Sequence, residues 1–226
     1  STGSPKGVMI SHRAAWNTVA EINARFHVGA QDRVLGLSNL GFDLSVYDIF
    51  GPLSVGGCLV LPESGRRGDP AHWAELIAGH QVTIWNSVPS QMEMLTAYLH
   101  SEPHLTLPDL RLALLSGDWI PVGLPPAIWR LLPGADVVSL GGATEASIWS
   151  IAHPIRSTDA PARSIPYGRQ LAGQSVEVLG PALVELPDLV TGELYIGGAG
   201  LALGYFGDAA RTAERFIHHP GDGRRL

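Results

Sequence analysis

Residues 82–140 decide the fold class. The stretch opens with VTIWNSVPSQMEMLTAYL (82–99), continues through LALL (112–115) and closes with ADVVSL (135–140). Short apolar runs alternate with longer segments whose apolar residues recur at helical spacing. The runs predict strands at 82–86, 112–115 and 136–140, and the longer segments predict helices at 90–99 and 124–132. Strands separated by helices predict an α/β fold with a mostly parallel sheet and crossover helices.

The same alternation extends toward the N-terminus. Ser11 is a typical N-cap for a helix whose apolar positions run to Phe26, and Gly29 follows it. The further elements expected here are strands at 33–37 and 58–61 and helices at 43–50 and 72–79.

The pattern changes near residue 150. Short strands are expected at 147–151, 175–179 and 193–196, between Gly, Pro and Asp turns, and a helix only at 208–216. This predicts a β-rich, barrel-like subdomain. We therefore expect residues 1–150 to form the α/β part and residues 151–226 the β-rich subdomain, packed together because no long linker separates them.

The composition excludes several classes of protein. With 226 residues, 45% of them hydrophobic and 16% charged, the chain can bury a sizeable core. The net charge is −6 and no basic stripe appears, which argues against a nucleic-acid partner. No apolar run approaches the ~20 residues of a membrane span, so no membrane partner is expected. Cys58 is the single cysteine, which excludes an intramolecular disulfide and fits a cytoplasmic location.

Two motifs lie in the first fifty residues. Ser1–Gly7 (STGSPKG) combines small hydroxyl residues, glycines and a lysine, a composition suited to cradling phosphate, although a solvated tail has the same composition. Gly41–Phe50 (GFDLSVYDIF) places Asp43 at the expected start of a helix. An aspartate there is usually an N-cap, which the residue pattern favours. The alternative is a carboxylate that faces a cationic group of a ligand.

Two further motifs follow expected strands. Ser139–Glu145 (SLGGATE) comes at the end of an apolar strand, where α/β proteins bind ligands. Its glycine pair would let a flat ligand lie against bare backbone, and its Thr and Glu suit a phosphate oxygen and a magnesium ion. A simple glycine turn is the alternative. Gly192–Tyr205 carries several glycines without the dinucleotide-binding spacing, so we interpret it as a strand and a glycine corner.

In this order and separation, the four motifs resemble those of the adenylation domain of a nonribosomal peptide synthetase, in the superfamily of adenylate-forming enzymes. The resemblance covers the whole chain. Ser1–Gly7 resembles the second half of the phosphate loop, Phe42–Ser45 the amino-acid motif, Gly142–Glu145 the nucleotide motif and Gly192–Tyr205 a later glycine motif. The family more often has proline at Ala143 and arginine at Leu203.

The resemblance also implies that parts of the family's domain lie outside this sequence. The chain opens within the phosphate loop and stops before the family's Tyr-Arg-Thr-Gly-Asp motif. The ribose-binding aspartate, and the small C-terminal domain with its lysine, would then be absent. We therefore expect a fragment of the large N-terminal subdomain, inactive by itself.

The resemblance implies a reaction and roles for the residues. Mg-ATP and an amino acid would form aminoacyl-AMP and pyrophosphate, and the aminoacyl group would then pass to the phosphopantetheine thiol of a carrier domain. Thr144, Glu145 and Lys6 would be the catalytic residues, with Glu145 holding Mg²⁺. ATP would be bound by Thr2, Gly3, Ser4, Lys6, Gly141, Gly142, Ala143 and Thr144, with adenine against the glycine pair.

The resemblance further implies an amino-acid pocket in which Asp43 pairs with the substrate α-ammonium. The other lining residues would be Leu44, Tyr47, Asn86, Leu114, Ser116, Leu140, Ile148 and Trp149. A pocket lined by these residues would be small and weakly polar, and it would hold no partner for a charged substrate side chain. It resembles that of cysteine-activating domains, of the kind that build thiazoline rings in secondary metabolites such as siderophores.

Several alternatives remain open. Serine or threonine could use Asn86 or Ser116 and is the second candidate for the substrate. A stand-alone acyl- or aryl-acid ligase would have no use for a buried carboxylate at Asp43, and a non-catalytic nucleotide-binding module is the third class. An MbtH-like helper is a candidate partner beside the carrier domain.

Overall fold

The computed structural model describes residues 6–159 and 163–226 and divides into two compact units. The first, here called the sheet unit, comprises Ile22–Gly141 and Ala152–Arg169. The second, the strand-pair unit, comprises the chain up to Glu21, Gly142–Ile151 and Gln170–Leu226. The predicted division into residues 1–150 and 151–226 stays a prediction.

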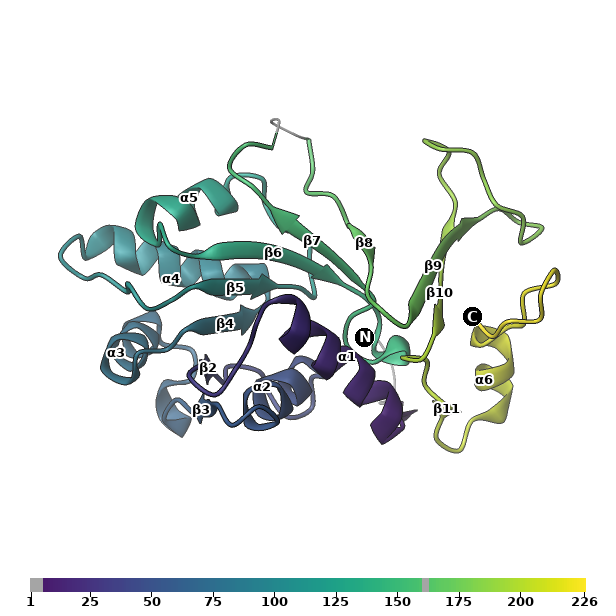
Figure 1. The fold of residues 1–226 in the computed structure, drawn as a ribbon, viewed down its shortest axis with the longest axis horizontal. Coiled ribbons are helices and arrows are strands. Elements are labelled where there is room, and N and C mark those ends of the chain that lie inside the picture. Colours follow the sequence, from purple (N-terminus) through teal and green to yellow (C-terminus); the bar gives the residue numbers. More distant parts are fainter. Residues whose placement is uncertain (1–5, 160–162) are drawn as a thin grey trace. The chain divides into compact units, whose positions relative to one another are not determined.

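A seven-stranded sheet has the order β3-β2-β4-β5-β6-β7-β8 (Figure 1). The pairs from β3 to β6 are all parallel, in a register that sets Asn86 opposite Leu114 and Leu114 opposite Val138. This confirms the predicted α/β class with a mostly parallel sheet. The strands are β2 (Arg33–Leu35), β3 (Cys58–Val60), β4 (Ile84–Ser87), β5 (Leu112–Leu115), β6 (Asp136–Gly141), β7 (Ile151–Ile155) and β8 (Arg169–Gln170).

The predicted helices are all present, and α2, α3, α4 and α5 lie in the connections between the parallel strands β2 to β6. Ser11 is the N-cap predicted for the first helix, since its Oγ accepts a hydrogen bond of 3.1 Å from the Ala14 N–H. The helices are α1 (His12–Arg25), α2 (Leu44–Leu53), α3 (Pro70–His80), α4 (Pro89–Ser101), α5 (Leu124–Leu131) and α6 (Ala209–Arg215), with 3₁₀ turns η1 (Ser64–Arg66) and η2 (Thr144–Ala146). None of the helices in the described ranges is long and apolar enough to span a bilayer.

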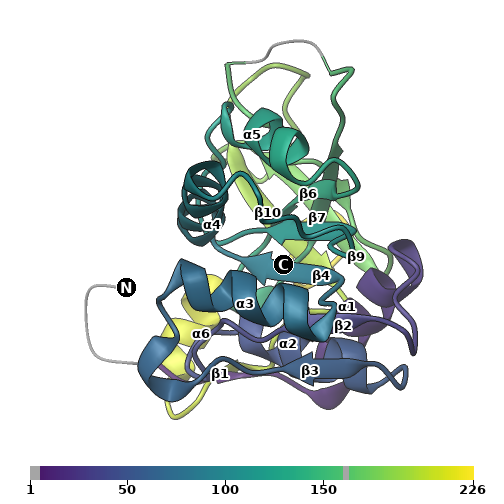
Figure 2. The same ribbon diagram turned by 90° about the vertical axis from the view of Figure 1, so that its left-hand side faces the viewer.

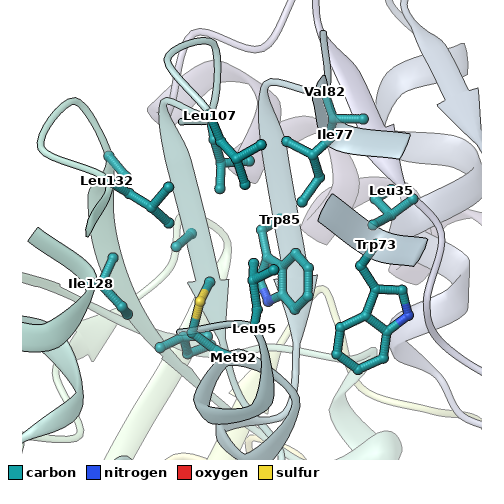
Figure 3. Packing of buried hydrophobic residues seen from close by; sticks show 14 of the residues in the cluster. Leu35, Trp73, Ile77, Val82, Trp85, Met92, Leu95, Leu107, Ile128 and Leu132 are labelled. Atoms are coloured by element: carbon teal, nitrogen blue, oxygen red, sulfur yellow. The ribbon is translucent and has the colours of Figure 1, made fainter. Parts of the chain in front are cut away.

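One face of the sheet forms the main hydrophobic core with α3, α4 and α5 (Figure 2). Side chains alternate between the two faces of a strand, so Trp85, Ala113 and Val137, which are in register, point to the same side. Trp73 of α3 meets Trp85 edge to face, with ring centroids 5.6 Å apart (Figure 3). The core anchors the central strands, whose carboxyl ends carry the candidate site.

The opposite face of the same strands carries Asn86 and Leu114, which alternate with the core residues. Asn86 contacts α2 through hydrogen bonds, so α2 lies on this second face. This face combines a buried amide with aliphatic side chains, whereas the core face opposite is mostly apolar, with Ser87 bonded to the Trp85 indole. It is therefore the side of the sheet on which polar chemistry is possible.

The strand-pair unit contains two antiparallel strand pairs in its described residues, and the predicted β-rich, barrel-like subdomain at 151–226 stays a prediction. β9 (Gln174–Leu179) pairs with β10 (Glu193–Gly198), and β1 (Val8–Met9) pairs with β11 (Gly204–Tyr205).

The strand predicted at 147–151 is wrong over most of its length. Ser147 and Ile148 have φ values of +62° and +72°, so the backbone turns in the left-handed region before β7 begins at Ile151. Ser147 stabilises the turn by donating a 2.7 Å hydrogen bond from Oγ to the Gly200 carbonyl. A β-branched residue such as Ile148 favours strands and rarely adopts a positive φ. The apolar run that contains it therefore predicted a strand where the backbone in fact turns.

Candidate functional site

Asp43 precedes α2 but does not cap it. Its backbone is already helical, with φ −66° and ψ −19°, and its carboxylate makes no capping hydrogen bond. Asp69, which precedes α3, is a true N-cap with φ −99° and ψ 108°, and its Oδ1 accepts from the Ala71 N–H at 3.0 Å. The capping interpretation of Asp43 is therefore wrong, because the helical conformation of Asp43 does not present its side chain to the first turn.

Tyr47 lies one turn after Asp43 on α2 and is fully buried. Its hydroxyl donates a 3.0 Å hydrogen bond to Asn23 Oδ1, and Asn23 Nδ2 in turn donates to the Gly51 carbonyl at 2.8 Å. Burial raises the pKa of Tyr47, so the phenol stays neutral. The bond to Asn23 fixes the ring in one orientation, as an apolar surface on the second face of the sheet.

Asn86 of β4 and Asp48 of α2 form a buried pair, 0% and 2% exposed. Asn86 Nδ2 donates to Asp48 Oδ1 at 2.7 Å and lies 3.5 Å from the Leu44 carbonyl oxygen. Asp48 Oδ2 accepts from the Ser38 N–H at 3.2 Å. Burial raises the pKa of Asp48 to about 6, although the hydrogen bonds from Asn86 and Ser38 act in the opposite direction.

The other oxygen of this pair has no partner. Asn86 Oδ1 is buried, and no group in the described ranges donates a hydrogen bond to it. Asp48 was not among the residues predicted for the site. Its neighbours in the sequence give no sign that it meets a strand 38 residues away.

The sheet unit brings together most of the residues predicted to line the amino-acid pocket. Leu114 and Ser116, two residues apart at the end of β5, are buried and on one side of the sheet. The predicted lining residues in this unit are Asp43, Leu44, Tyr47, Asn86, Leu114, Ser116 and Leu140. The other predicted lining residues, Ile148 and Trp149, belong to the strand-pair unit and follow its left-handed turn.

The chain itself covers the backbone of the glycine pair in the nucleotide motif. A Cβ at Gly141 would lie 2.1 Å from the Tyr167 ring, so this ring already occupies the face predicted to be bare. In the strand-pair unit, a Cβ at Gly142 would lie 2.8 Å from the Ile148 carbonyl oxygen. The glycines are therefore needed for packing within the chain, and the predicted position of adenine against them stays a prediction.

Lys6, Glu145 and Tyr205 form a hydrogen-bonded cluster within the strand-pair unit. Glu145 Oε1 accepts from Lys6 Nζ at 2.8 Å and from the Tyr205 hydroxyl at 2.6 Å. Lys6 Nζ also lies 4.8 Å from the centre of the Tyr205 ring, in cation–π range. The predicted residues Lys6 and Glu145 thus meet although 139 positions separate them, and Tyr205 joins them without having been predicted.

The electrostatics of the cluster favour its charged form. The hydrogen bond from Lys6 to Glu145 raises the pKa of Lys6. Burial alone would raise the pKa of Glu145, but the hydrogen bonds from Lys6 and Tyr205 outweigh it, so this pKa is lowered. Burial, together with the bond to Glu145, raises the pKa of Tyr205 and keeps it a donor.

The cluster borders an open pocket of about 990 Å³ in the same unit. Arg211 and Arg215 of α6 also line it, each paired with an acidic neighbour, Asp208 and Glu214 respectively. Ala143 and Thr144 are exposed next to Glu145. The predicted residues Thr2, Gly3 and Ser4 lie outside the described residues.

A metal could be held here only with help from a ligand. Within residues 6–159 and 163–226, no cluster of three or more His, Cys, Asp or Glu side chains suits a metal ion. Glu145 is the pocket carboxylate that bonds Lys6, a cation that suits phosphate. Such a donor set fits Mg²⁺, which is commonly bound through one or two carboxylates and the oxygens of a substrate phosphate.

These features define an α/β protein with a polar face at the ends of its parallel strands and a separate lysine–carboxylate–tyrosine cluster suited to a phosphorylated ligand. The model of the family described as "AMP-binding enzyme" matches residues 1–206. The chain belongs to this family.

Named relatives and solved structures resemble the chain over nearly its full length. Pyochelin synthetase PchF of Pseudomonas aeruginosa is 59% identical over 226 residues, which is 100% of this chain and 12% of that protein. The crystal structure of the nonribosomal peptide synthetase FmoA3 in its AMPPNP-bound form matches with a TM-score of 0.93 and 45% identity, over 99% of this chain and 24% of that one. The form bound to α-methyl-L-serine-AMP gives the same TM-score and identity and covers 26% of that chain. The chain therefore spans a small part of the length of these proteins.

Proposed function

We propose that this chain belongs to an amino-acid-activating adenylation domain of a nonribosomal peptide synthetase, which forms aminoacyl-AMP from an amino acid and ATP. The observation that carries the proposal is Asp43, a carboxylate that does not cap its helix and that directly precedes α2, the helix bonded to Asn86 on the second face of the sheet. A cationic α-ammonium is the ligand group that such a carboxylate suits. The likeness to FmoA3, of which one crystal form binds α-methyl-L-serine-AMP, supports the same chemistry.

In the proposed reaction, a carboxylate oxygen of the amino acid attacks the α-phosphorus of ATP. A new O–P bond forms and the bond to pyrophosphate breaks. Lys6, with Thr2 and Ser4, neutralises charge on the departing pyrophosphate, and Thr144 donates to the α-phosphate. Glu145 would hold Mg²⁺, which when bound would screen the phosphate charges. The lowered pKa of Glu145 supports this role, because the ligand must be ionised.

We further propose L-cysteine as the substrate, with L-serine or L-threonine as the second candidate. Leu44, Tyr47 and Leu114 are buried apolar or aromatic residues, a lining that suits a short, weakly polar side chain. Asn86 and Ser116 are polar groups that suit a thiol or hydroxyl. The aminoacyl group would next pass to a carrier-domain phosphopantetheine thiol. An MbtH-like protein as a second partner, and a cytoplasmic location, complete the proposal.

The test is ATP–pyrophosphate exchange by the natural polypeptide that carries this chain, with a panel of amino acids and the deamino analogue 3-mercaptopropionate. We expect exchange with L-cysteine to exceed that with every other substrate. Exchange that prefers the deamino acid would indicate an acyl-acid ligase. Nucleotide binding without exchange for any acid would indicate a non-catalytic module, and either result would overturn the proposal.

Two aspartate variants make this test specific. Asp43→Ala should abolish exchange with L-cysteine, because truncating one side of a desolvated charge pair costs roughly 2–5 kcal/mol. It should leave the thermal melt near normal, because Asp43 does not cap α2. The matched control is Asp69→Ala, which removes a true N-cap and should cost about 1 kcal/mol of stability while exchange persists. A lowered melt with unchanged cysteine preference in Asp43→Ala would mean that Asp43 is structural.

A further inference from the structure

We propose that Asp48 is a positioning residue: it holds the side-chain amide of Asn86 so that the Asn86 carbonyl oxygen, and not its NH₂ group, is presented to the substrate side chain. The site would then select short side chains that donate a hydrogen bond, a thiol or a hydroxyl, over apolar side chains of the same size. This inference rests on the proposed function and adds to it the chemical basis of substrate selection.

The hydrogen bonds on one side of Asn86 determine its orientation. Nδ2 faces Asp48 Oδ1 at 2.7 Å and the Leu44 carbonyl oxygen at 3.5 Å. A carboxylate and a backbone carbonyl only accept, so the NH₂ group must point toward them. If the amide were flipped, Asn86 Oδ1 would meet two acceptors, and both contacts would be repulsive.

Asp48 is itself held in place. The Ser38 N–H donates to its second oxygen, Oδ2, at 3.2 Å, so both carboxylate oxygens have partners. Leu44 and Asp48 are four residues apart on α2 and therefore lie on the same side of the helix, facing β4. The orientation of Asn86 is thus imposed by α2, the element that follows Asp43.

The fixed amide leaves one unmet acceptor. Asn86 Oδ1 is buried without a donor from the described residues, an arrangement that is unfavourable and uncommon in folded proteins. It belongs to the same buried face as Tyr47 and Leu114, residues of the proposed pocket. An S–H or O–H group of a substrate would satisfy this oxygen, whereas a methyl group would bury it unpaired.

The experiment compares L-cysteine with L-2-aminobutyrate, in which a methyl group replaces the thiol. The readout is the ratio of their kcat/KM values in ATP–pyrophosphate exchange, measured on the natural polypeptide that carries this chain. We expect the wild type to prefer L-cysteine by about tenfold or more. Asp48→Asn should reduce the ratio at least about fivefold, through the amino-acid KM and with the KM for ATP unchanged. Asparagine has only one acceptor oxygen for Ser38 and Asn86, and its NH₂ group can pair with a flipped Asn86.

Asp32→Asn is the matched control. Asp32 is also a buried aspartate of the sheet unit, 6% exposed, but it pairs with Arg111 and Thr83. This variant should keep the wild-type ratio even if its melt is lowered. An equal fall of the ratio in both variants would mean that general loosening, and not Asp48, controls selection, which would overturn the inference.

A second variant and the wild-type ratio keep the inference testable even if Asp48→Asn does not fold. Asn86→Leu keeps the branched shape of the side chain but removes its carbonyl and NH₂ groups, and it should also lower the ratio. A wild-type ratio near one, or an unchanged ratio in well-folded Asp48→Asn, would overturn the inference and leave the proposed function intact. Absence of amino-acid-dependent exchange by the wild type across the whole panel would instead defeat the proposed function, and the inference with it.

Discussion

At the scale of single residues, the shared oxygen of Glu145 is the feature most open to test. Oε1 accepts from both Lys6 and Tyr205, so the carboxylate is oriented by two donors before any ligand arrives. Outer groups that orient a metal ligand commonly change metal affinity 10- to 100-fold when altered. Glu145 is thus the residue at which proposed phosphate chemistry and observed geometry coincide.

We predict that Glu145→Gln raises the Mg²⁺ concentration needed for half-maximal exchange by tenfold or more, with little change in the amino-acid KM. The substitution keeps the volume but removes the anionic oxygen that Mg²⁺ prefers. A Mg²⁺ titration of exchange, with the amino-acid KM measured at saturating Mg²⁺, checks this. Glu193→Gln is the control, because Glu193 lines the same pocket but accepts its hydrogen bond from the Tyr195 hydroxyl. Equal effects on metal and amino acid would show that Glu145 is structural.

The sequence could predict parts of the site that consist of neighbouring residues. Lys6, Asp43 and Glu145 were singled out by their motifs. Asp48 and Tyr205 were not, because their importance comes from contacts that join positions 38 and 60 residues apart. Such contacts are decided by tertiary packing, which no local spacing reveals.

At the scale of elements, α2 carries more of the proposed site than any other helix. Gly51 within it is required by Tyr47: a Cβ at Gly51 would lie 2.9 Å from Cε2 and Cζ of that ring. Tyr47 cannot move away easily, since it is fully buried and its hydroxyl is bonded to Asn23. The helix therefore accepts a residue of poor helix propensity in order to seat the ring.

Gly51→Ala should consequently destabilise the protein by about 1–3 kcal/mol and raise the amino-acid KM, despite the better helix propensity of alanine. Gly79→Ala in α3 is the control. A Cβ at Gly79 would meet nothing within 4 Å, so that variant should be as stable as the wild type or more so, by up to about 1 kcal/mol. Urea denaturation and exchange kinetics on both variants check the contrast, and a stabilised Gly51→Ala would contradict it.

The sequence predicted the longer elements well and the shortest ones poorly. The predicted strand at 112–115 coincides with β5, because an apolar run buried on both faces gives a strong signal. The two-residue strands β1, β8 and β11 were not predicted. Strands this short owe their definition to pairing with distant partners rather than to a pattern of their own.

At the scale of the whole molecule, chain order and spatial grouping diverge. The strand-pair unit collects three separate segments of the chain, and its residues Gly142–Ile151 include the motif from Gly142 to Glu145. Composition can locate a change of character near residue 150, but it cannot show that a ten-residue segment belongs with the chain's ends. That grouping follows from long-range bonds such as Lys6–Glu145 and Ala202 N–H to the Glu145 carbonyl.

Two buried aspartates should give the stability of the molecule opposite dependences on pH. Burial raises the pKa of Asp48 to about 6 from 3.8, so the folded state binds its proton more tightly than the unfolded chain does. That contribution to stability is fully present below pH ~4 and is lost as pH rises toward ~6. Burial acts to raise the pKa of Asp32 too, but hydrogen bonds from Arg111, Gly29 and Thr83 outweigh it, and this pKa is lowered. Its contribution is present above pH ~4 and is lost as pH falls.

These signs predict how two isosteric variants respond to pH. Because asparagine does not titrate, Asp48→Asn should become more stable relative to the wild type by about 2 kcal/mol between pH ~4 and ~7.5. The stability of Asp32→Asn relative to the wild type should stay nearly constant over that interval, because the wild type loses its ionised Asp32–Arg111 pair only below pH ~4. Urea denaturation at the two pH values, on the wild type and both variants, measures the differences. A pH-independent difference for Asp48→Asn would mean that the Asp48 carboxyl titrates alike in the folded and unfolded states. It would then be solvated rather than enclosed between α2 and β4, contrary to its burial and its bond to Asn86.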